Sequence, residues 1–484
     1  MIKLRFQRIK QALIFSFCLL AIFTVYSQSN HLAQKREIAL DNYINEVTKK
    51  YGITGTAVAI LKDGKVIYKK YQGKSNLEYN VPISEQSLFR MHSLSKIFVS
   101  VGIFQLIEKN KISLEDKISK YLEDLPQSWK HIKIKHLLSH SSGLPDVIEL
   151  ESNSDEKAIA EIIYKKEKRF KPGDKADYNQ TNFWMLNRII RKISKRDFKE
   201  FILKDQFDSN DKEARFSNIQ EIIPHRISEY KPNKKGQLKN FYFKVPEYLY
   251  GAAGLHITLN KFIEWDKKLN DESLLKIGSK KKMLAPFIYK KGKGFTEGGW
   301  DLQSLNGFST YGFNGGGLVN YRRIPSKNLS IIWLTNGYST PYPIERVTNA
   351  IAGLIDENLK DVTPLVFKSL KKSFLLKKEQ LALSDFSKVK KQYPFINYES
   401  VLNSLGYQFM KEKKINKAIY VFKLNTKEYS NSANTFDSLA EAYFINKENN
   451  KAKKNYEKAI ALGGTRGNAK KMLQKINEIK RSNL

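Results

Sequence analysis

The stretch GTAVAILKDGKVIYKKYQG, residues 55–73, decides the fold. It consists of two apolar runs rich in strand-forming residues on either side of Asp63 and Gly64. An Asp-Gly pair between two such runs is typical of a β-hairpin, because both residues tolerate the left-handed backbone of a tight turn. The sequence therefore predicts two antiparallel strands near the start of the chain.

A second pair of strands is predicted far along the chain, in GLVNYRRIP (317–325) and NLSIIWLTNG (328–337). Between the two pairs the apolar residues follow mainly helical spacing, for example in residues 94–110 and 183–202. Strands at both ends of a region with helices between them indicate an α+β domain whose terminal strands share one antiparallel sheet. We expect this domain to occupy residues 38–355.

The last part of the chain has a helical pattern that repeats every 34 residues. This period is typical of the tetratricopeptide repeat, although a helical hairpin with fortuitous spacing is an alternative. We expect tetratricopeptide-like helical repeats over residues 396–484, preceded by a connection over residues 356–395. Two repeats are fewer than the roughly three that such arrays need, so the tail should pack on the preceding α+β domain, on the helix after Thr465 or on another chain. The residues that recur are Ser404-Leu405 and Ser438-Leu439, Phe409 and Tyr443, Ala418 and Ala452, and Phe422 and Tyr456.

Residues 1–27 are predicted to be a secretory signal peptide. Four basic residues in MIKLRFQRIK precede the apolar run ALIFSFCLLAIFTVY (12–26), which is followed by the small residue Ser27. The run is shorter than the roughly 20 residues of a membrane span, so cleavage is expected, with an uncleaved signal anchor as the alternative. The protein is therefore expected in the periplasm or outside the cell, with peripheral or anchored membrane association left open.

The composition narrows the classes of function. Lys and Arg number 84 against 49 Asp and Glu, a formal charge of +35, but they are spread through every segment. No Arg-rich stripe alternates with aromatic residues, so a nucleic-acid partner is not expected. The single cysteine, Cys18, lies in the predicted signal peptide, which excludes disulfides and thiol catalysis in the mature chain. The seven histidines form no cluster with acidic residues, so neither a metal nor another cofactor is expected.

Ser93 and Lys96 in RMHSLSKIF (90–98) form a Ser-x-x-Lys pattern. The Ser93 copy is followed by an apolar helix, which places Lys96 one turn after the serine, within reach of its hydroxyl. Partial burial would lower the pKa of this lysine, and its neutral amine would then accept the serine proton. The helix dipole would stabilise a developing oxyanion. The Ser-x-x-Lys spacing alone does not identify an active site, because the chain contains five further copies. These are Ser154/Lys157, Ser273/Lys276, Ser279/Lys282, Ser369/Lys372 and Ser387/Lys390.

Successive stretches over residues 38–355 resemble landmarks of the serine β-lactamase-related family, in the order in which the family has them. This family includes class C β-lactamases, D-alanyl-D-alanine carboxypeptidases and aminopeptidases, and esterases. The resemblance implies a β-lactamase/transpeptidase-like domain, followed here by the helical tail. The stretches are SLFRMHSLSKIF (87–98), IKHLLSHSSGLPD (134–146), KPGDKADYNQTNFWMLNRII (171–190), GAAGLHITLNKFIEWDKKL (251–269), YGFNGGGLVNYRRIP (311–325) and IIWLTNG (331–337).

The resemblance assigns roles to individual residues. It implies that Ser93 is the acylated nucleophile and Lys96 its general base. Tyr178 matches the tyrosine of the family's Tyr-x-Asn motif, which helps to activate the serine and to protonate the leaving group. The oxyanion hole would combine the backbone N–H groups of Ser93 and Gly316.

Two positions depart from the family pattern. Gln180 stands in place of the asparagine of the second motif, and its longer amide would still bind a substrate carbonyl. Phe313, Asn314 and Gly315 stand where the family usually has Lys or His, then Thr, Ser or Asn, then Gly. Phenylalanine neither donates a hydrogen bond nor carries charge. Binding of a substrate carboxylate, as in penicillins or a terminal D-alanine, is therefore less expected than binding of an apolar acyl or alcohol group.

Two hypotheses of different classes follow. The first is a secreted serine hydrolase that acts on a small-molecule or peptide ester or amide, as an esterase or a D-amino-acid peptidase, with β-lactam hydrolysis less favoured. The second is a catalytically degenerate, penicillin-binding-like module that binds or senses a ligand and contacts protein partners through its repeats. The Ser-Lys-Tyr set favours the first hypothesis, and the changes at Gln180 and Phe313 motivate the second.

Overall fold

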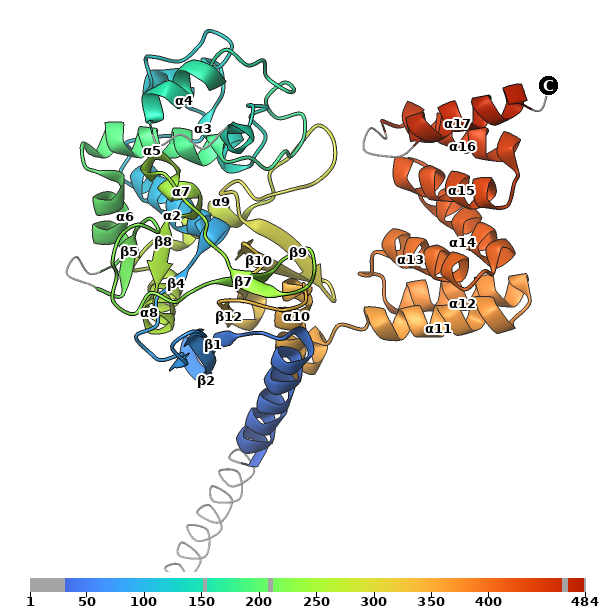
Figure 1. Ribbon diagram of the computed structural model, residues 1–484, viewed down its shortest axis with the longest axis horizontal. Coiled ribbons are helices and arrows are strands. Elements are labelled where there is room, and N and C mark those ends of the chain that lie inside the picture. The colour runs from blue at the N-terminus through green and yellow to red at the C-terminus, as the bar shows by residue number, and fades with distance from the viewer. Residues whose placement is uncertain (1–30, 151–154, 208–211, 464–468, 483–484) are drawn as a thin grey trace, which may run out of the picture. The chain divides into compact units, whose positions relative to one another are not determined.

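The computed structural model describes residues 31–150, 155–207, 212–463 and 469–482, so the predicted signal peptide lies outside the described residues. The chain divides into two compact units, Met1–Lys360 and Asp361–Leu484 (Figure 1). Within the described ranges, no helix is both long enough and apolar enough to cross a membrane.

The first unit is built on a seven-stranded antiparallel sheet with the strand order β3-β2-β1-β12-β11-β10-β9. The predicted hairpin forms β1 (Gly55–Lys62) and β2 (Lys65–Asn76), and its turn has positive φ at Asp63 and Gly64 (51° and 74°). On its other side, β1 pairs with β12 (Leu329–Thr335). The prediction that strands from both ends of the domain share one sheet is therefore confirmed.

The C-terminal strands of the sheet are joined by tight turns. β11 pairs with β12 as the second predicted hairpin. Between β10 and β11, the N–H of Leu318 donates to the carbonyl of Gly315 at 2.9 Å, and Gly316 and Gly317 have φ of 60° and 71°. Two consecutive left-handed residues are what a two-residue hairpin turn requires, and glycine adopts them without strain. The remaining strands of the sheet are β3 (Val81–Pro82), β9 (Asp301–Leu305), β10 (Phe308–Gly315) and β11 (Val319–Ile324).

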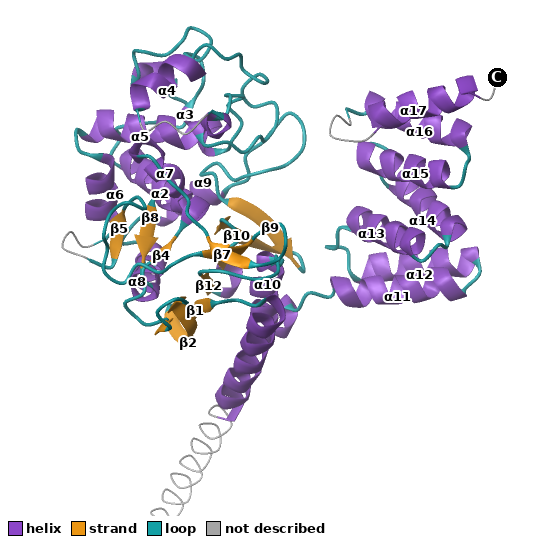
Figure 2. Ribbon diagram, viewed as in Figure 1, coloured by secondary structure: helices purple, strands orange, loops and turns teal. Residues whose placement is uncertain are grey.

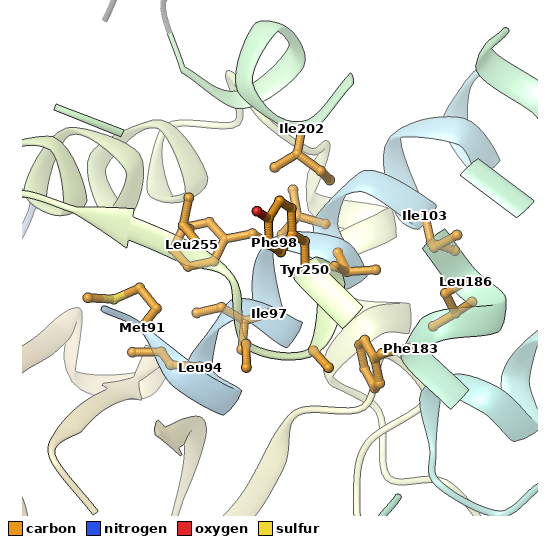
Figure 3. Packing of buried hydrophobic residues seen from close by; sticks show 14 of the residues in the cluster. Met91, Leu94, Ile97, Phe98, Ile103, Phe183, Leu186, Ile202, Tyr250 and Leu255 are labelled. Atoms are coloured by element: carbon orange, nitrogen blue, oxygen red, sulfur yellow. The ribbon is translucent and has the colours of Figure 1, made fainter. Parts of the chain in front are cut away.

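Helix α2 (Ser95–Glu108) forms the centre of the helical part of this unit. Every residue from Ser95 to Leu106 is buried, because other elements cover the helix on all sides. Figure 3 shows Phe98 and its neighbours packed among side chains from several elements, with Phe183 among them. The other helices are α3 (Ile134–Leu138), α4 (Glu156–Ile163), α5 (Thr181–Ser194), α6 (Phe198–Gln206), α7 (Tyr250–Ala253), α8 (Leu259–Asn270) and α9 (Ile277–Leu284).

The helical pattern predicted over residues 183–202 is two helices, α5 and α6. Helix α5 ends at Lys195, which has the left-handed conformation of a helix C-cap (φ 53°). Asp197 then begins α6, because its carboxylate accepts the N–H groups of Lys199 and Glu200 at 2.8 and 3.4 Å.

The opposite face of the large sheet is covered by a helix that includes residues 31–51 and by α10 (Ile344–Ile355). Both contribute to an apolar cluster with Val58 and Trp333 of the sheet. Short strands form two further sheets, one of three strands and one of two, and Figure 2 shows β4, β5 and β8 close together. These are β4 (Phe89–Arg90), β8 (Leu255–Ile257) and β5 (Ala214–Phe216), and the hairpin of β6 (Tyr230–Pro232) and β7 (Leu238–Asn240).

The second unit consists of helices in its described part, and it begins earlier than the sequence predicted. Residues 356–395, expected to be a connection, contain α11 and α12, whose residues Leu370, Phe374 and Phe386 are buried in the core of this unit. The prediction was wrong because many lysines on the exposed faces concealed the helical apolar spacing. The helices are α11 (Thr363–Leu376), α12 (Glu379–Gln392), α13 (Tyr398–Lys411), α14 (Ile415–Glu428), α15 (Ala433–Ile445), α16 (Asn449–Ala461) and α17 (Ala469–Ser482).

The apolar positions of the 34-residue period occupy equivalent places in the helices of the tail. Residues of α13 recur in α15, and residues of α14 recur in α16. The helical tail is therefore observed, while its assignment to the tetratricopeptide class stays a prediction. The recurring apolar residues, all buried, are Leu405 and Leu439, Phe409 and Tyr443, Ala418 and Ala452, and Phe422 and Tyr456.

The close packing of α13 on α14 predicts the effect of a substitution at Gly406. A Cβ atom there would lie 2.4 Å from the ring of Phe422. Gly406→Val is therefore expected to destabilise this unit by about 1–3 kcal/mol. Hydrogen exchange in α13 and α14 would measure the loss, with Ser404→Val at an exposed position of α13 as the control. Equal exchange rates in the two variants would contradict the packing.

Candidate active site

Ser93 lies in a short 3-10 helix (His92–Leu94) directly before α2. Its side chain is half-buried, and it lines a cavity of about 360 Å³ together with Gln180 and Gly316. The structure therefore brings three of the predicted site residues, which are far apart in the sequence, to one hollow at the N-terminal end of α2.

Lys96 is in the first turn of α2 and is only 1% exposed. Its ammonium group donates to Gln180 Oε1 at 2.8 Å and to the carbonyl of Ala252 at 2.9 Å. Burial lowers the pKa of Lys96, and the opposing effects of Tyr178 and Asp146 do not cancel this. Desolvation therefore favours the neutral amine, which is the form that accepts a proton.

Gln180 precedes α5, and its backbone N–H donates to Asp146 Oδ1 at 2.9 Å. Because an ammonium group only donates hydrogen bonds, the amide oxygen of Gln180 must face Lys96. The longer side chain at this position thus keeps a direct contact with the predicted base.

Tyr178 lies beside Lys96. The Lys96 Nζ atom is 4.9 Å from the centre of the Tyr178 ring. The ring of Tyr178 also lies 4.6 Å from His140 and 6.1 Å from Phe313, measured between ring centres, while 38% of the tyrosine remains exposed. Tyr178 therefore has one edge in contact with the site and access to solvent.

The residues of the third motif point in different directions, because successive side chains of a strand lie on opposite faces of a sheet. Phe313 is buried against Tyr178 and Phe295 on the side of the site. Asn314 instead donates from Nδ2 to Glu345 Oε1 of α10 at 2.9 Å, on the other face. The side chain of Asn314 therefore faces away from the cavity, and a part of this residue in substrate binding stays a prediction.

Gly315 and Gly316 bring β10 and the following turn close to the Ser93 segment. A Cβ atom at Gly315 would lie 2.1 Å from the carbonyl oxygen of Met91, so only glycine fits where the two segments meet. Gly316 follows in the turn and lines the same cavity as Ser93.

Sequence reasoning missed a buried hydrogen bond between His92 and Glu229, next to Ser93. His92 Nε2 lies 2.7 Å from Glu229 Oε1, and their side chains are 5% and 9% exposed. Burial would raise the pKa of Glu229, but the charge and hydrogen bond of His92, together with Arg90, lower it overall, so the carboxylate stays ionised. His92 was identifiable only as the neighbour of Ser93, and nothing in the local sequence marks Glu229.

The stretch 134–146, quoted above only as a landmark, holds the Tyr178 segment in place. His140 is fully buried, and burial and the charge of Lys96 set its pKa well below the usual value. Its Nδ1 accepts the backbone N–H of Asn179 at 3.2 Å and the Asn182 amide at 3.1 Å, so a neutral His140 carries its proton on Nε2. His140 and Asp146 thus hold the two peptide N–H groups on either side of Asn179, between Tyr178 and Gln180.

Comparison with known proteins identifies the family and the fold of the first unit. The family model described as Beta-lactamase matches residues 40–353. A penicillin-binding protein of Bacillus subtilis (strain 168) is 25% identical over 299 residues, which cover 56% of this chain and 65% of that protein. The protein flp of Staphylococcus aureus (strain NCTC 8325 / PS 47) is 27% identical over 172 residues, which cover 34% of each chain. The chain thus spans less than two thirds of the length of these relatives.

Solved structures share the fold. An octameric penicillin-binding protein homologue from Pyrococcus abyssi superimposes with a TM-score of 0.58 at 22% identity, over 69% of this chain and 81% of that one. The D-amino acid amidase from Ochrobactrum anthropi SV3 gives a TM-score of 0.56 at 17% identity, over 67% of this chain and 99% of that one. These likenesses support the β-lactamase/transpeptidase-like fold of the first unit.

The burial of Lys96 predicts a characteristic pH dependence of acylation. If neutral Lys96 is the base, the rate of Ser93 acylation by an activated ester rises as pH passes through its lowered pKa. The midpoint should therefore lie below about 10.4, the value of an exposed lysine. Stopped-flow measurement of the acylation rate against pH checks this. A rate that begins to rise only at the pH of an ordinary lysine would contradict it.

Proposed function

The chain belongs to the serine β-lactamase-related family, and on this premise we propose that it is a serine hydrolase that cleaves an ester or amide through an acyl-enzyme on Ser93. One observation carries the proposal. Ser93 opens on a cavity while Lys96, one turn further along, is buried and has a lowered pKa. This is the combination that turns a weakly nucleophilic hydroxyl into an acylating group.

In the proposed reaction the neutral amine of Lys96 accepts the proton of the Ser93 hydroxyl as its Oγ attacks the substrate carbonyl. The backbone N–H groups of Ser93 and Gly316 stabilise the oxyanion that forms. Tyr178, beside Lys96, gives its proton to the leaving alcohol or amine and takes up the proton that Lys96 accepted from Ser93. A water molecule then attacks the acyl carbonyl and gives a proton to the neutral Lys96, which returns it to Ser93 Oγ as the acid product leaves.

The cavity favours a substrate with an apolar group. Aromatic and aliphatic side chains form most of its wall, none of its lining residues is acidic, and the lysines Lys231 and Lys244 also line it. Phe313 places an aromatic ring where the family usually has a cation, which favours neutral esters or amides over penicillins. An esterase or a D-amino-acid peptidase type of activity fits these features better than a β-lactamase. The apolar lining residues include Ile148, Phe241, Phe243, Val245 and Leu249.

The contact of Gln180 with Lys96 weighs against the alternative of a degenerate binding module. The amide oxygen of Gln180 reaches the Lys96 ammonium at 2.8 Å, so the change at this position leaves the base with a partner.

The proposal has two further parts. The first is export of the protein, predicted from residues 1–27, and the second is binding of a protein partner through the helical tail.

Labelling with a fluorophosphonate tests the proposed nucleophile. The probe is expected to label the wild-type protein, and Ser93→Ala is expected to abolish both labelling and the hydrolysis of an activated ester, with a loss of at least about 10³-fold. Ser273→Ala, in an exposed copy of the same Ser-x-x-Lys pattern, is the control and should behave like the wild type. An unlabelled wild-type protein without esterase activity would contradict the proposal.

Phe313→His tests the interpretation of the third motif. Imidazole restores a hydrogen-bond donor beside Tyr178, so kcat/KM for an ester that carries a carboxylate should increase relative to that for its neutral analogue. Competition between the two esters measures this ratio directly. An unchanged ratio would mean that residue 313 does not contribute to carboxylate selection.

A further inference from the structure

We propose that Glu229 and Lys231, on either side of Tyr230 at the start of β6, position the two halves of the oxyanion hole. The inference rests on the proposed function, because it concerns the backbone N–H groups of Ser93 and Gly316. These two amides belong to segments more than two hundred positions apart in the sequence. Residues 229–231 contact both segments.

The first contact fixes the peptide unit that carries the Ser93 N–H. That unit begins at the carbonyl of His92, so the backbone conformation of His92 determines where the N–H points. His92 has a φ of 46°, a left-handed conformation that a residue with a side chain adopts only when its surroundings enforce it. The ionised carboxylate of Glu229 holds the imidazole at 2.7 Å through a charge-assisted hydrogen bond inside the protein.

The second contact fixes the turn that carries the Gly316 N–H. Gly315, Gly316 and Gly317 are consecutive, and a run of three glycines has more conformational freedom than any other sequence. The Lys231 ammonium donates to the carbonyl of Gly316 at 2.9 Å and lies 4.0 Å above the ring of Phe241. The lysine thereby restricts Gly316, the residue of this turn whose N–H must point into the cavity.

The two contacts meet at the ring of His92. A Cβ atom at Gly316 would lie 3.0 Å from Cγ of His92, so the imidazole packs directly on the Gly316 backbone. The rings of Phe241 and Phe243 lie 6.4 and 6.1 Å from it, measured between ring centres. The contacts around the two amides thus run from Glu229 to His92, from His92 to Gly316 and from Gly316 to Lys231.

The hairpin that carries these residues has its own anchors. The N–H of Tyr230 donates to the carbonyl of Asn336 at 2.8 Å, and its hydroxyl donates to Glu78 at 2.6 Å. Glu78 therefore holds the same hairpin without a hydrogen bond to His92 or Gly316 among the described residues. A substitution of Glu78 therefore weakens the hairpin without removing a contact to the oxyanion hole, whereas substitutions of Glu229 and Lys231 remove such a contact.

Four variants test the inference on the full-length protein. Removal of an oxyanion donor typically costs 10²–10³-fold in kcat, so loosening one donor should cost about 10- to 100-fold. We expect this loss of kcat on a small neutral activated ester for Glu229→Gln and for Lys231→Met. KM should change by less than about 3-fold, because Glu229 does not line the cavity and Lys231, which does, carries a charge that a neutral ester does not use. Glu78→Gln and the exposed Lys239→Met, on the partner strand, are the controls and should remain within about 3-fold of the wild type.

A second measurement guards against misfolding of a variant. The phosphonyl oxygen of a fluorophosphonate adduct occupies the oxyanion hole, so labelling rates should fall in parallel with kcat, while circular dichroism stays unchanged. Lys231→Arg, which still donates to a carbonyl, should recover part of the loss. If one of the two variants does not fold, the other carries the test.

Each remaining outcome would overturn the inference. Wild-type kcat and labelling in both Glu229→Gln and Lys231→Met would show that neither residue positions the amides. An equal loss in Glu78→Gln would assign the effect to support of the hairpin. A rise in KM confined to carboxylate-bearing esters in Lys231→Met would make Lys231 a substrate-binding residue. A wild-type protein that takes no label would instead reject the proposed function, and the inference with it.

Discussion

The burial of Lys96 is the constraint on which the rest of the site depends. An ammonium group removed from water costs on the order of several kcal/mol unless protein atoms take over its hydrogen bonds. Here Gln180 Oε1 and the carbonyl of Ala252 do so, from the start of α5 and from α7. The same burial lowers the pKa of Lys96. Desolvation therefore both raises the free-energy cost of the charged lysine and favours the neutral amine that accepts the Ser93 proton.

The fold supplies this environment by enclosing α2 completely. Its residues from Ser95 to Leu106 are buried, and the cavity opens at Ser93, in the short 3-10 helix directly before α2. The large sheet then brings the end of β10 against this point, where Gly315 passes so close to Met91 that no side chain fits. Nucleophile, base and predicted oxyanion amides come together because α2 and β10 meet at one place.

Local pattern predicted those parts of the structure that depend on neighbouring residues. The Asp63-Gly64 hairpin and the pairing of terminal strands followed from apolar runs and turn residues, and Ser93 and Lys96 were set apart by the helix that follows them. The direction of Asn314 was predictable in principle from strand alternation, but the sequence does not show which face carries the site. The contact of His92 with Glu229 spans 137 positions, and neither residue has a local signal for it. Helices α11 and α12 were not predicted because their exposed faces carry many lysines, although their buried faces are apolar with helical spacing.

The central claim is that Ser93 forms a covalent acyl intermediate. Rapid quenching of a reaction with an activated ester, followed by peptide mapping with mass spectrometry, tests this most directly. The account predicts an acyl adduct on the peptide that contains Ser93, formed within the first turnover and lost as product is released. An adduct confined to another residue, or steady hydrolysis without any adduct, would contradict it.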